Sequence, residues 1–318
     1  MQKDVTQKQL EDWNDVFADI YNGIAFGGKK ILQEENLISL PTESFTKNMD
    51  GTVQQGFRDV RKADQRQGEY RLIWSLENQT GVDNTMPERI MGYEYASYEA
   101  QVKKLMAQNR KEKKRAYTRR LHDHQKLAPV VTAVLHWGEK EWNGPRCLHD
   151  MLNFPEELEE ELRPMVSDYS FHLIEMSKLP QEVRERFRSD FRILAEYAAT
   201  RKNPKEWEAF LQTYQRKLLH PEELMNALEA LSGDSRYEQA YEKITEEEKE
   251  EGAKMCVVAE KMEQIGIQKG IEKGIQQNTL RTVCNMLKKN KPESEIFELT
   301  ECSRELFKEA KRQMEEAD

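Results

Sequence analysis

The sequence lacks long hydrophobic runs and has few cysteines. No stretch reaches the roughly 20 apolar residues that a helix needs to cross a bilayer, and residues 1–13 lack the apolar region of a secretory signal. The four cysteines show no CxxC spacing (Cys147, Cys256, Cys284 and Cys302), which favours reduced thiols over a disulfide framework. These absences predict a cytoplasmic protein that does not bind a membrane.

The chain is also poor in apolar residues and in net positive charge. Of its 318 residues, 37% are hydrophobic and 34% are charged, whereas an ordinary globular domain is about 45–50% apolar and about 25% charged. The 49 Lys and Arg against 58 Asp and Glu give a net charge of −9. This balance excludes a uniformly basic nucleic-acid-binding protein but leaves room for a local basic patch. We expect part of the chain to form long, solvated helix outside a compact core.

Common catalytic and metal-binding motifs are absent as well. The sequence has no P-loop, no dinucleotide fingerprint and no Gly-x-Ser-x-Gly elbow, which removes the nucleotide-binding and serine-hydrolase classes that carry them. The His122-Asp-His124 and Cys147-x-His149 groups do not have the paired spacing of a structural zinc site. A zinc protein is therefore disfavoured.

Composition and periodicity divide the chain into three ranges. Residues 1–180 mix helical and strand patterns, residues 181–232 read as helices only, and residues 233–318 form a charged tail with few aromatic residues. The pattern predicts an α/β fold, with a mixed central sheet flanked by helices, followed by an all-helical C-terminal region.

The first range gives most of the expected elements. A helix capped by Thr6 carries one apolar face and ends at Gly27-Gly28; the residues of that face are Leu10, Trp13, Phe17, Ile20 and Ile24. A second helix is expected from Pro87 onward. Strands are expected over residues 36–40, 56–62, 69–79, 128–137 and 171–176. Residues 63–68 are polar, so the second and third of these strands are expected to form a hairpin.

The tail carries an internal repeat with a period of four residues. Its Gly-Ile-x-Lys units begin at Gly266 and Gly270, and a third Gly-Ile pair follows at Gly274. Glycine costs about 1 kcal/mol per helical position relative to alanine, so this run does not serve helix propensity. The stripe of small residues predicts a self-association segment that allows close helix packing. A flexible charged tail with an accidental repeat is the alternative.

Two carboxylates are expected to converge at one end of the predicted hairpin. Asp59 lies on one strand, and Glu77 and Gln79 lie two residues apart on the next, so the latter two share a face. Carboxylates on adjacent strands are suitable ligands for Mg²⁺, and metal-assisted phosphodiester hydrolysis uses such a site. The alternative is a pair of solvated acids, but Glu77 ends an apolar run, and burying its charge has a cost that a metal would offset.

Several segments together resemble a known family. They are Phe57-Arg-Asp-Val, Leu76-Glu-Asn-Gln-Thr-Gly-Val-Asp, Met86-Pro-Glu-Arg-Ile-Met-Gly-Tyr, Pro129-Val-Val-Thr-Ala-Val-Leu-His-Trp-Gly and Trp142-Asn-Gly-Pro-Arg-Cys-Leu-His. The sequence is similar to the PD-(D/E)XK nuclease superfamily, in particular the recombination-promoting nuclease / putative transposase family of bacteria, over about residues 10–200. The resemblance implies a restriction-endonuclease-like core of four strands and Mg²⁺-dependent cleavage of DNA, with Mn²⁺ as a substitute ion.

The resemblance also implies roles for single residues. Asp59 matches the metal-binding aspartate, Glu77 matches the second acidic ligand, and Gln79 stands where the superfamily usually has lysine. Glutamine can hold a water or a phosphate oxygen but supplies no positive charge. Asp19 is a candidate outer ligand from the first helix, in competition with Asp12 and Asp15.

A basic tract follows the helix that begins at Pro87. Between Lys103 and Arg120 it contains nine basic residues and one acid, Glu112, and such a concentration is typical of a phosphate-binding surface. The candidate DNA-binding residues are Lys103, Lys104, Arg110, Lys111, Lys113, Lys114, Arg115, Arg119 and Arg120. A solvated helix end is the alternative.

The sequence therefore supports two hypotheses. The first is a Mg²⁺-dependent DNA endonuclease that forms homo-oligomers through its C-terminal helical region. The second is a catalytically weak or inactive DNA-binding and oligomerising protein that uses the nuclease fold as a scaffold. The missing lysine at position 79 favours the second hypothesis, whereas the retained Asp59, Glu77 and Gln79 favour the first.

Overall fold

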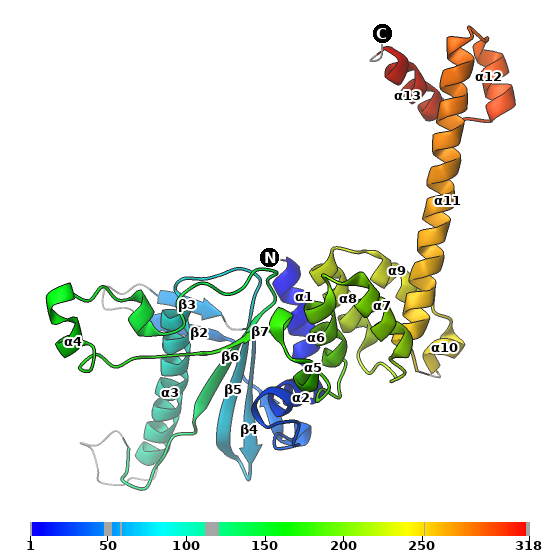
Figure 1. The fold of residues 1–318 in the computed structure, drawn as a ribbon. Coiled ribbons are helices and arrows are strands. Elements are labelled where there is room, and N and C mark those ends of the chain that lie inside the picture. Colours follow the sequence, from blue (N-terminus) through cyan, green and yellow to red (C-terminus); the bar gives the residue numbers. More distant parts are fainter. Residues whose placement is uncertain (1, 48–52, 58, 112–120, 251, 316–318) are drawn as a thin grey trace.

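A mixed sheet of five strands forms the centre of the N-terminal part of the molecule (Figure 1). The computed structural model describes residues 2–47, 53–57, 59–111, 121–250 and 252–315. The strand order is β1-β4-β5-β6-β7. The strands are β1 (Leu37–Ser39), β4 (Val60–Arg66), β5 (Glu69–Gln79), β6 (Val130–His136) and β7 (His172–Glu175). The predicted α/β class, with its all-helical C-terminal region, is confirmed.

The sheet is antiparallel on one side of β5 and parallel on the other. Val60 of β4 pairs with Leu76 of β5 in the antiparallel hairpin, and Ile73 of β5 pairs with Val130 of β6 in parallel. Gln67 and Gly68, with φ of 52° and 83°, form the hairpin turn, and a two-residue turn with positive φ matches the twist of the paired strands. The turn is thus shorter than the predicted 63–68, because β4 continues to Arg66.

The predicted strand over residues 56–62 is wrong in its boundaries. Residues 53–57 form β3 (Val53–Phe57), which pairs with β2 (Glu43–Lys47) in a separate two-stranded sheet. The chain then bends at Asp59 before β4 begins at Val60. This bend sends the two parts of the predicted strand to different sheets, so Asp59 lies just before a strand rather than within one.

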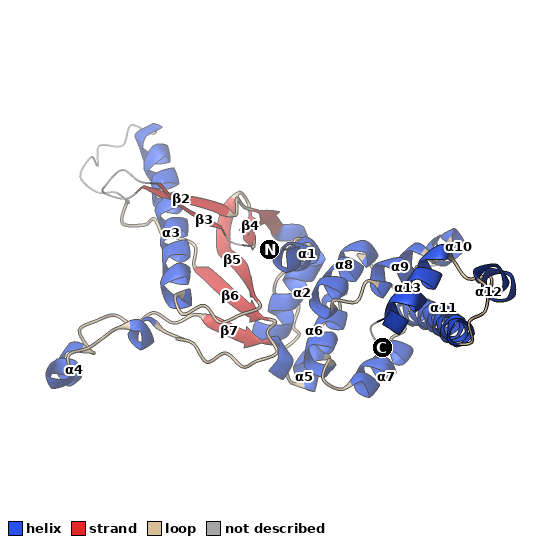
Figure 2. Cartoon of the chain, turned by 90° about the horizontal axis from the view of Figure 1, so that it is seen from above, coloured by secondary structure: helices blue, strands red, loops and turns tan. Residues whose placement is uncertain are grey.

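Helices cover both faces of the central sheet (Figures 1 and 2). The helix α3 (Met86–Lys111) lies on one face, where Ile90 and Tyr93 pack near Val134 of β6. The helices α1 (Gln2–Glu11) and α2 (Asn14–Ala25) lie on the other face. The connection from β5 to β6 through α3 is the crossover that parallel neighbours require.

The prediction of one continuous N-terminal helix is wrong at Asp12-Trp13. Trp13 has extended backbone angles (φ −69°, ψ 132°) and separates α1 from α2. The break is held from outside the helices, because the buried Lys62 donates to the backbone oxygen of Asp12 at 2.7 Å. Leu10, Phe17 and Ile20 of the predicted face are fully buried, as expected, whereas Trp13 is 46% exposed.

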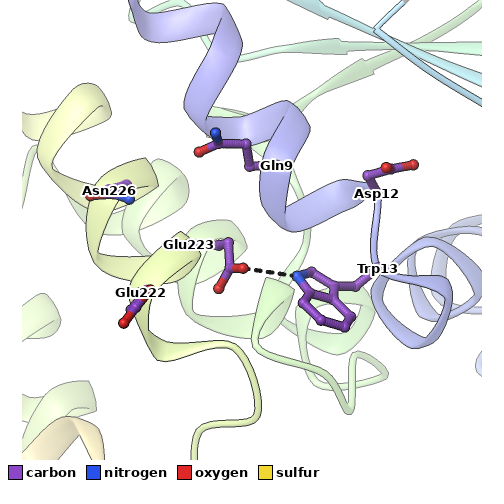
Figure 3. A pocket seen from close by; sticks show the side chains of 6 residues that line it. All are labelled: Gln9, Asp12, Trp13, Glu222, Glu223 and Asn226. Carbon is purple, nitrogen blue, oxygen red and sulfur yellow. Dashed lines mark hydrogen bonds between the residues drawn. The ribbon is translucent and has the colours of Figure 1, made fainter.

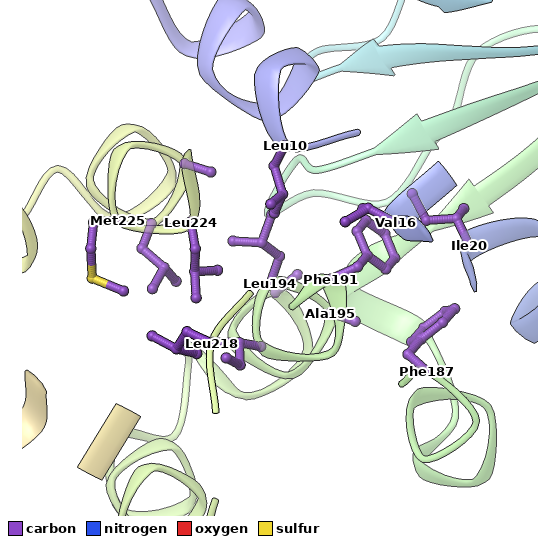
Figure 4. Close-up of a cluster of buried hydrophobic side chains, with 14 of the residues drawn as sticks. Leu10, Val16, Ile20, Phe187, Phe191, Leu194, Ala195, Leu218, Leu224 and Met225 are labelled. Atoms are coloured by element: carbon purple, nitrogen blue, oxygen red, sulfur yellow. The ribbon is translucent and has the colours of Figure 1, made fainter. Parts of the chain in front are cut away.

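A set of helices continues from the sheet toward the C-terminus (Figure 2). They are α5 (Gln181–Arg184), α6 (Phe191–Thr200), α7 (Pro204–Thr213), α8 (Pro221–Ser232), α9 (Arg236–Glu242) and α10 (Glu246–Glu250). The short helix α4 (Glu159–Leu162) precedes β7 in the chain and lies apart from this set, on the other side of the sheet. A hydrophobic cluster extends from Leu10 to Ile265 and connects this set with α1, α2 and the sheet (Figure 4). The division of the chain at about residues 180 and 232 stays a prediction.

The helix α11 (Met255–Lys288) extends from this set as a long rod (Figure 1). At its far end it packs with α12 (Glu293–Thr300) and α13 (Arg304–Glu315) around a separate cluster that includes Val283, Ile296 and Phe307. Among the described residues, no helix combines the length and apolar character that a membrane span requires.

Candidate active site

Asp59 lies at the edge of the sheet where β5 ends. Its Oδ2 accepts a hydrogen bond from the backbone N–H of Asn78 at 2.6 Å. That N–H belongs to the peptide that joins Glu77 to Asn78, so the Asp59 carboxylate lies beside the backbone of Glu77. The antiparallel register, with Val60 opposite Leu76, explains this placement. Whether Asp59 and Glu77 bind one cation stays a prediction.

Glu77 and Gln79 lie on the face of β5 that α3 covers. Glu77 is buried, at 3% exposure, and its Oε1 accepts hydrogen bonds from Gln79 Nε2 at 3.2 Å and from Arg89 Nη2 at 2.5 Å. The contact with Gln79 confirms that these two side chains share a face, as the alternation along a strand predicts. The contact with Arg89 brings a guanidinium to the carboxylate, and the sequence analysis did not foresee this.

Arg89 is held in place by a second acid and by an aromatic ring. Its Nη1 donates to Asp83 Oδ2 at 2.6 Å, and its guanidinium lies 5.8 Å from the ring centre of Tyr93. Burial disfavours the charge of Arg89, but the nearby Glu77, Asp83 and Tyr93 outweigh this effect and raise the pKa of the guanidinium above its ordinary value. Arg89 is therefore a fixed positive charge beside Glu77.

Asn78 connects the same strand end to α1 on the opposite face of the sheet. Its side chain donates to Glu11 Oε2 at 2.6 Å and accepts from Trp137 Nε1 at 2.6 Å. Burial raises the pKa of Glu11 well above its usual value; the hydrogen bond from Asn78 lowers it, and the nearby charge of Asp59 raises it further. Glu11, on α1, thus interacts electrostatically with Asp59.

The structure places Asp19 in another environment. Its Oδ2 accepts three hydrogen bonds at 2.7 Å, from the backbone N–H groups of Arg188 and Ser189 and from the Ser189 hydroxyl. These bonds connect α2 to the turn that precedes α6. Its competitors also have other partners, because Asp12 forms an ion pair with Lys62 and Asp15 Oδ1 lies 2.9 Å from His220 Nε2. The structure does not bring Asp19 together with Asp59 and Glu77.

The described residues do not form a closed metal cage, and magnesium binding at the candidate site stays a prediction. Across the described ranges, no three His, Cys, Asp or Glu side chains gather closely enough to form a metal site by themselves. Mg²⁺ commonly uses one or two protein carboxylates and completes its shell with water and substrate phosphates. Asp59 and Glu77, at one edge of the sheet, would supply these two carboxylates.

The basic tract begins on the far half of α3. Lys103, Lys104 and Arg110 are exposed, and Lys104 Nζ lies 4.5 Å from the ring centre of Tyr70 near the start of β5. Arg89 and Arg110 are separated by about 30 Å of helix at 1.5 Å per residue. Of the other predicted DNA-binding residues, Lys111 is the last of α3 and its side chain lies outside the description, as do residues 113–120. The tract therefore starts at the opposite end of the sheet from Asp59 and Glu77.

A surface pocket between α1 and α8 has the wrong charge for a nucleic-acid groove (Figure 3). Its lining residues are Gln9, Asp12, Trp13, Glu222, Glu223 and Asn226. Trp13 Nε1 donates to Glu223 Oε1 at 3.2 Å, and the Trp13 ring stacks on His220 at 4.2 Å. The three acids of this lining repel phosphate, so the pocket is not part of the candidate site.

Two residues that the sequence analysis missed carry recognisable signals. Arg89 lies in the first turn of a helix that directly follows β5, and Tyr93 follows it by four residues, on the same side of the helix. A first-turn position after a short loop brings a side chain back toward the end of the preceding strand. Glu11 carries no such signal, because only the docking of α1 on the sheet brings it to Asn78.

The fold and this strand end together define a protein with acidic residues at the edge of a mixed sheet, joined to an all-helical region. A family model described as "Putative transposase, YhgA-like" matches residues 36–202, which is more than half of the chain. The chain belongs to this YhgA-like transposase family, which connects it with transposition and nucleic-acid processing. The match includes Asp59, Glu77 and Arg89 but not Glu11 or Asp19. Neither the curated proteins nor the solved structures contain a match to the chain.

Proposed function

We propose that the protein is a Mg²⁺-dependent DNA endonuclease of the PD-(D/E)XK type, in the recombination-promoting nuclease group. The observation that supports the proposal is the hydrogen bond from Asn78 N–H to Asp59 Oδ2, at the end of β5 that also carries Glu77. Membership of a transposase family makes DNA the expected substrate.

Each residue of the site has a role in the proposed reaction. Asp59 and Glu77 hold the ion, with Mn²⁺ as a substitute, and a bound Mg²⁺ would activate water and offset the charge that develops on the phosphate. The Gln79 amide orients the water or a phosphate oxygen by hydrogen bonding. Arg89, which binds Glu77 at 2.5 Å, supplies the positive charge that a lysine at position 79 would otherwise give.

The proposed DNA path runs along α3. Lys103, Lys104 and Arg110 bind the phosphate backbone in this proposal, together with the basic residues that follow in sequence. The helix distance of about 30 Å between Arg89 and Arg110 corresponds to about nine base pairs at 3.4 Å each. A duplex of that length can contact both the tract and the acids.

DNA cleavage with matched variants tests the proposed function. Purified protein should nick supercoiled DNA in the presence of Mg²⁺ and lose that activity in EDTA. Asp59→Ala and Glu77→Ala should each abolish nicking, whereas Asp19→Ala should leave most of it if the protein stays folded. Equal nicking by the wild type and by both site variants would contradict the proposal, because it would show a contaminating nuclease.

One observation favours the second candidate function, a DNA-binding assembly protein with weak or no catalysis. The tail exposes large apolar side chains, with Ile267, Ile271 and Ile275 each more than half exposed. In this case the chain would bind DNA and oligomerise through its C-terminal helical region. DNA retention without nicking in the assay above would favour this function.

A further inference from the structure

The middle of α11 is exposed to solvent over more than three turns. Residues 267–278 are all exposed, a length of about 18 Å, and Figure 1 shows this segment as a rod between two packed ends. Ile267, Ile271 and Ile275 are 56%, 53% and 61% exposed. These isoleucines follow each other at four-residue spacing, so they form one apolar stripe.

Glycines accompany the isoleucines along this stripe. A Cβ added at Gly270 or at Gly274 would meet no heavy atom within 4 Å among the described residues, so packing within the chain does not require glycine there. Each glycine costs a helix about 1 kcal/mol relative to alanine. Glycine instead lets the backbone of another helix approach closely enough for a side chain to rest on it.

The stripe is acidic at one end and basic at the other. At 100° per residue, Glu260 and Glu263 project from the same side of α11 as the isoleucines and precede them along the helix. Arg281 projects from this side as well and follows the isoleucines. All three side chains are exposed, and Arg281 Nη2 lies 3.3 Å from Asn278 Oδ1 of its own helix. An apolar centre with opposite charges at its two ends is complementary to its own reversed copy.

We propose that a second copy of the chain packs against this stripe with α11 antiparallel, centred between Gly270 and Ile271. This register places each isoleucine level with a glycine of the other copy: Ile271 with Gly270, Ile267 with Gly274, and Ile275 with Gly266. The same register places Glu260 level with Arg281 at both ends. A parallel pair would instead place isoleucine level with isoleucine and like charge level with like charge, which is unfavourable.

The proposed interface leaves the existing contacts of α11 intact. The buried residues through which α11 contacts the rest of the chain include Met262, Ile265 and Val283. At 100° per residue these project about a third to half of a turn away from Ile271. The second copy therefore covers exposed surface over residues 267–278; at Gly266 it would lie beside the Arg236 side chain of α9, whose Nη1 is 3.3 Å from an added Cβ.

Sedimentation of the full-length chain tests the surface. The wild type should dimerise reversibly, and Ile271→Glu should raise the dimer dissociation constant at least about tenfold, or 1.4 kcal/mol. The control Gln276→Glu adds the same charge on the exposed opposite side of the helix and should leave the constant unchanged. A wild type that stays monomeric up to about 100 µM, or a dimer that Ile271→Glu does not weaken, would overturn the proposal.

Charge reversal tests the antiparallel register. Glu260→Arg and Arg281→Glu should each weaken the dimer, and the double variant should restore it, because the exchanged charges again meet across the interface. In a parallel dimer each of the two positions faces its own copy, so each single substitution exchanges one like-charge pair for another. A dimer whose dissociation constant neither single substitution changes would therefore contradict the antiparallel register. A double variant no stronger than the singles would also overturn it. None of these outcomes depends on nuclease activity.

Discussion

At the scale of single residues, the end of β5 combines acids with one fixed cation. Glu77 is buried yet ionisable, and Arg89 and Gln79 both donate to its Oε1. Leaving a charged carboxylate without a counter-charge in such a place costs several kcal/mol, so Arg89 stabilises the site when no metal is bound. In our proposal the same guanidinium also offsets charge on the phosphate.

Replacing Arg89 separates its two effects. Arg89→Gln removes the charge and should lower the rate of DNA cleavage at saturating Mg²⁺ by about 10²-fold, the loss typical of one electrostatic contact in a transition state. It should also strengthen Mn²⁺ binding by Glu77, because the competing cation is gone. The cleavage assay measures the first effect, and calorimetric titration with Mn²⁺ measures the second.

Arg89→Lys is the matched control for that experiment. It keeps the positive charge but loses the forked contact with Glu77 and Asp83, so its cleavage rate should lie between those of the wild type and Arg89→Gln. Unchanged cleavage and unchanged Mn²⁺ affinity in Arg89→Gln would show that Arg89 serves only the fold.

A second buried acid, Asp190, makes stability depend on pH. Its Oδ2 accepts hydrogen bonds from Leu219 N–H at 2.8 Å and from His220 N–H at 2.7 Å. Burial raises the pKa of Asp190; the two N–H groups lower it in part, and the charge of Asp15 raises it again. Because the folded-state pKa lies above the unfolded value, ionisation of Asp190 disfavours folding, and this penalty grows as pH rises through the unfolded pKa.

Asp190→Asn removes that ionisation and keeps an acceptor oxygen. The stability of the variant minus that of the wild type should therefore increase as pH rises from 4 to 7. The difference between their urea unfolding midpoints at each pH measures this. A difference that is constant or that falls with rising pH would contradict the assignment.

At the scale of elements, close packing fixes α2 against the turn before α6. A Cβ added at Gly23 would lie 2.4 Å from Cε1 of Phe187, whose ring is fully buried and packs on Phe191 at 5.0 Å. The small residue therefore allows α2 to approach this part of the core.

Gly23→Ala should destabilise the protein by about 1–3 kcal/mol through overpacking. Gly92→Ala is its control, because Gly92 lies on α3, where a Cβ meets no heavy atom within 4 Å in the described part of the chain. Removing a helical glycine at that open position should stabilise by up to about 1 kcal/mol. Urea denaturation measures both, and equal effects of the two substitutions would contradict the packing argument.

The elements that the sequence predicted well are those with strong local patterns. The apolar runs of β5 and β6 and the proline at the start of α3 were sufficient to place these elements. The pairing of β3 with β2 was missed because Val53-Gln-Gln-Gly-Phe57 has no clear alternation of apolar and polar residues. The break at Trp13 depends on the contact of Lys62 with Asp12, 50 residues apart in sequence, and no local pattern predicts such a contact.

The same reasoning explains what was predicted at the candidate site. The shared face of Glu77 and Gln79 follows from strand alternation, and hairpin pairing was sufficient to bring Asp59 to the end of β5. Glu11 reaches the site only through the docking of α1 on the sheet. The basic tract follows the acids closely in sequence, but α3 carries it to the far end of the sheet.

At the scale of the whole molecule, the transposase-family region and the rod α11 are separate parts of the chain. The family match ends at residue 202, and the rod α11 begins at Met255, beyond the helices that pack on α1 and the sheet. In our proposals the sheet binds and cuts DNA, while the rod joins two copies. An antiparallel pair of rods would give one assembly two copies of the proposed site.

Binding of Mn²⁺ to the full chain tests the central claim most directly, because it does not depend on finding the right DNA substrate. Calorimetric titration of the wild type, Asp59→Asn and Glu77→Gln compares the affinity for Mn²⁺ with and without each carboxylate, at nearly constant side-chain volume. We predict that the wild type binds Mn²⁺ at this site and that each single substitution weakens the binding at least about tenfold. Binding that neither substitution weakens, or that only one of them weakens, would contradict a cation shared by Asp59 and Glu77.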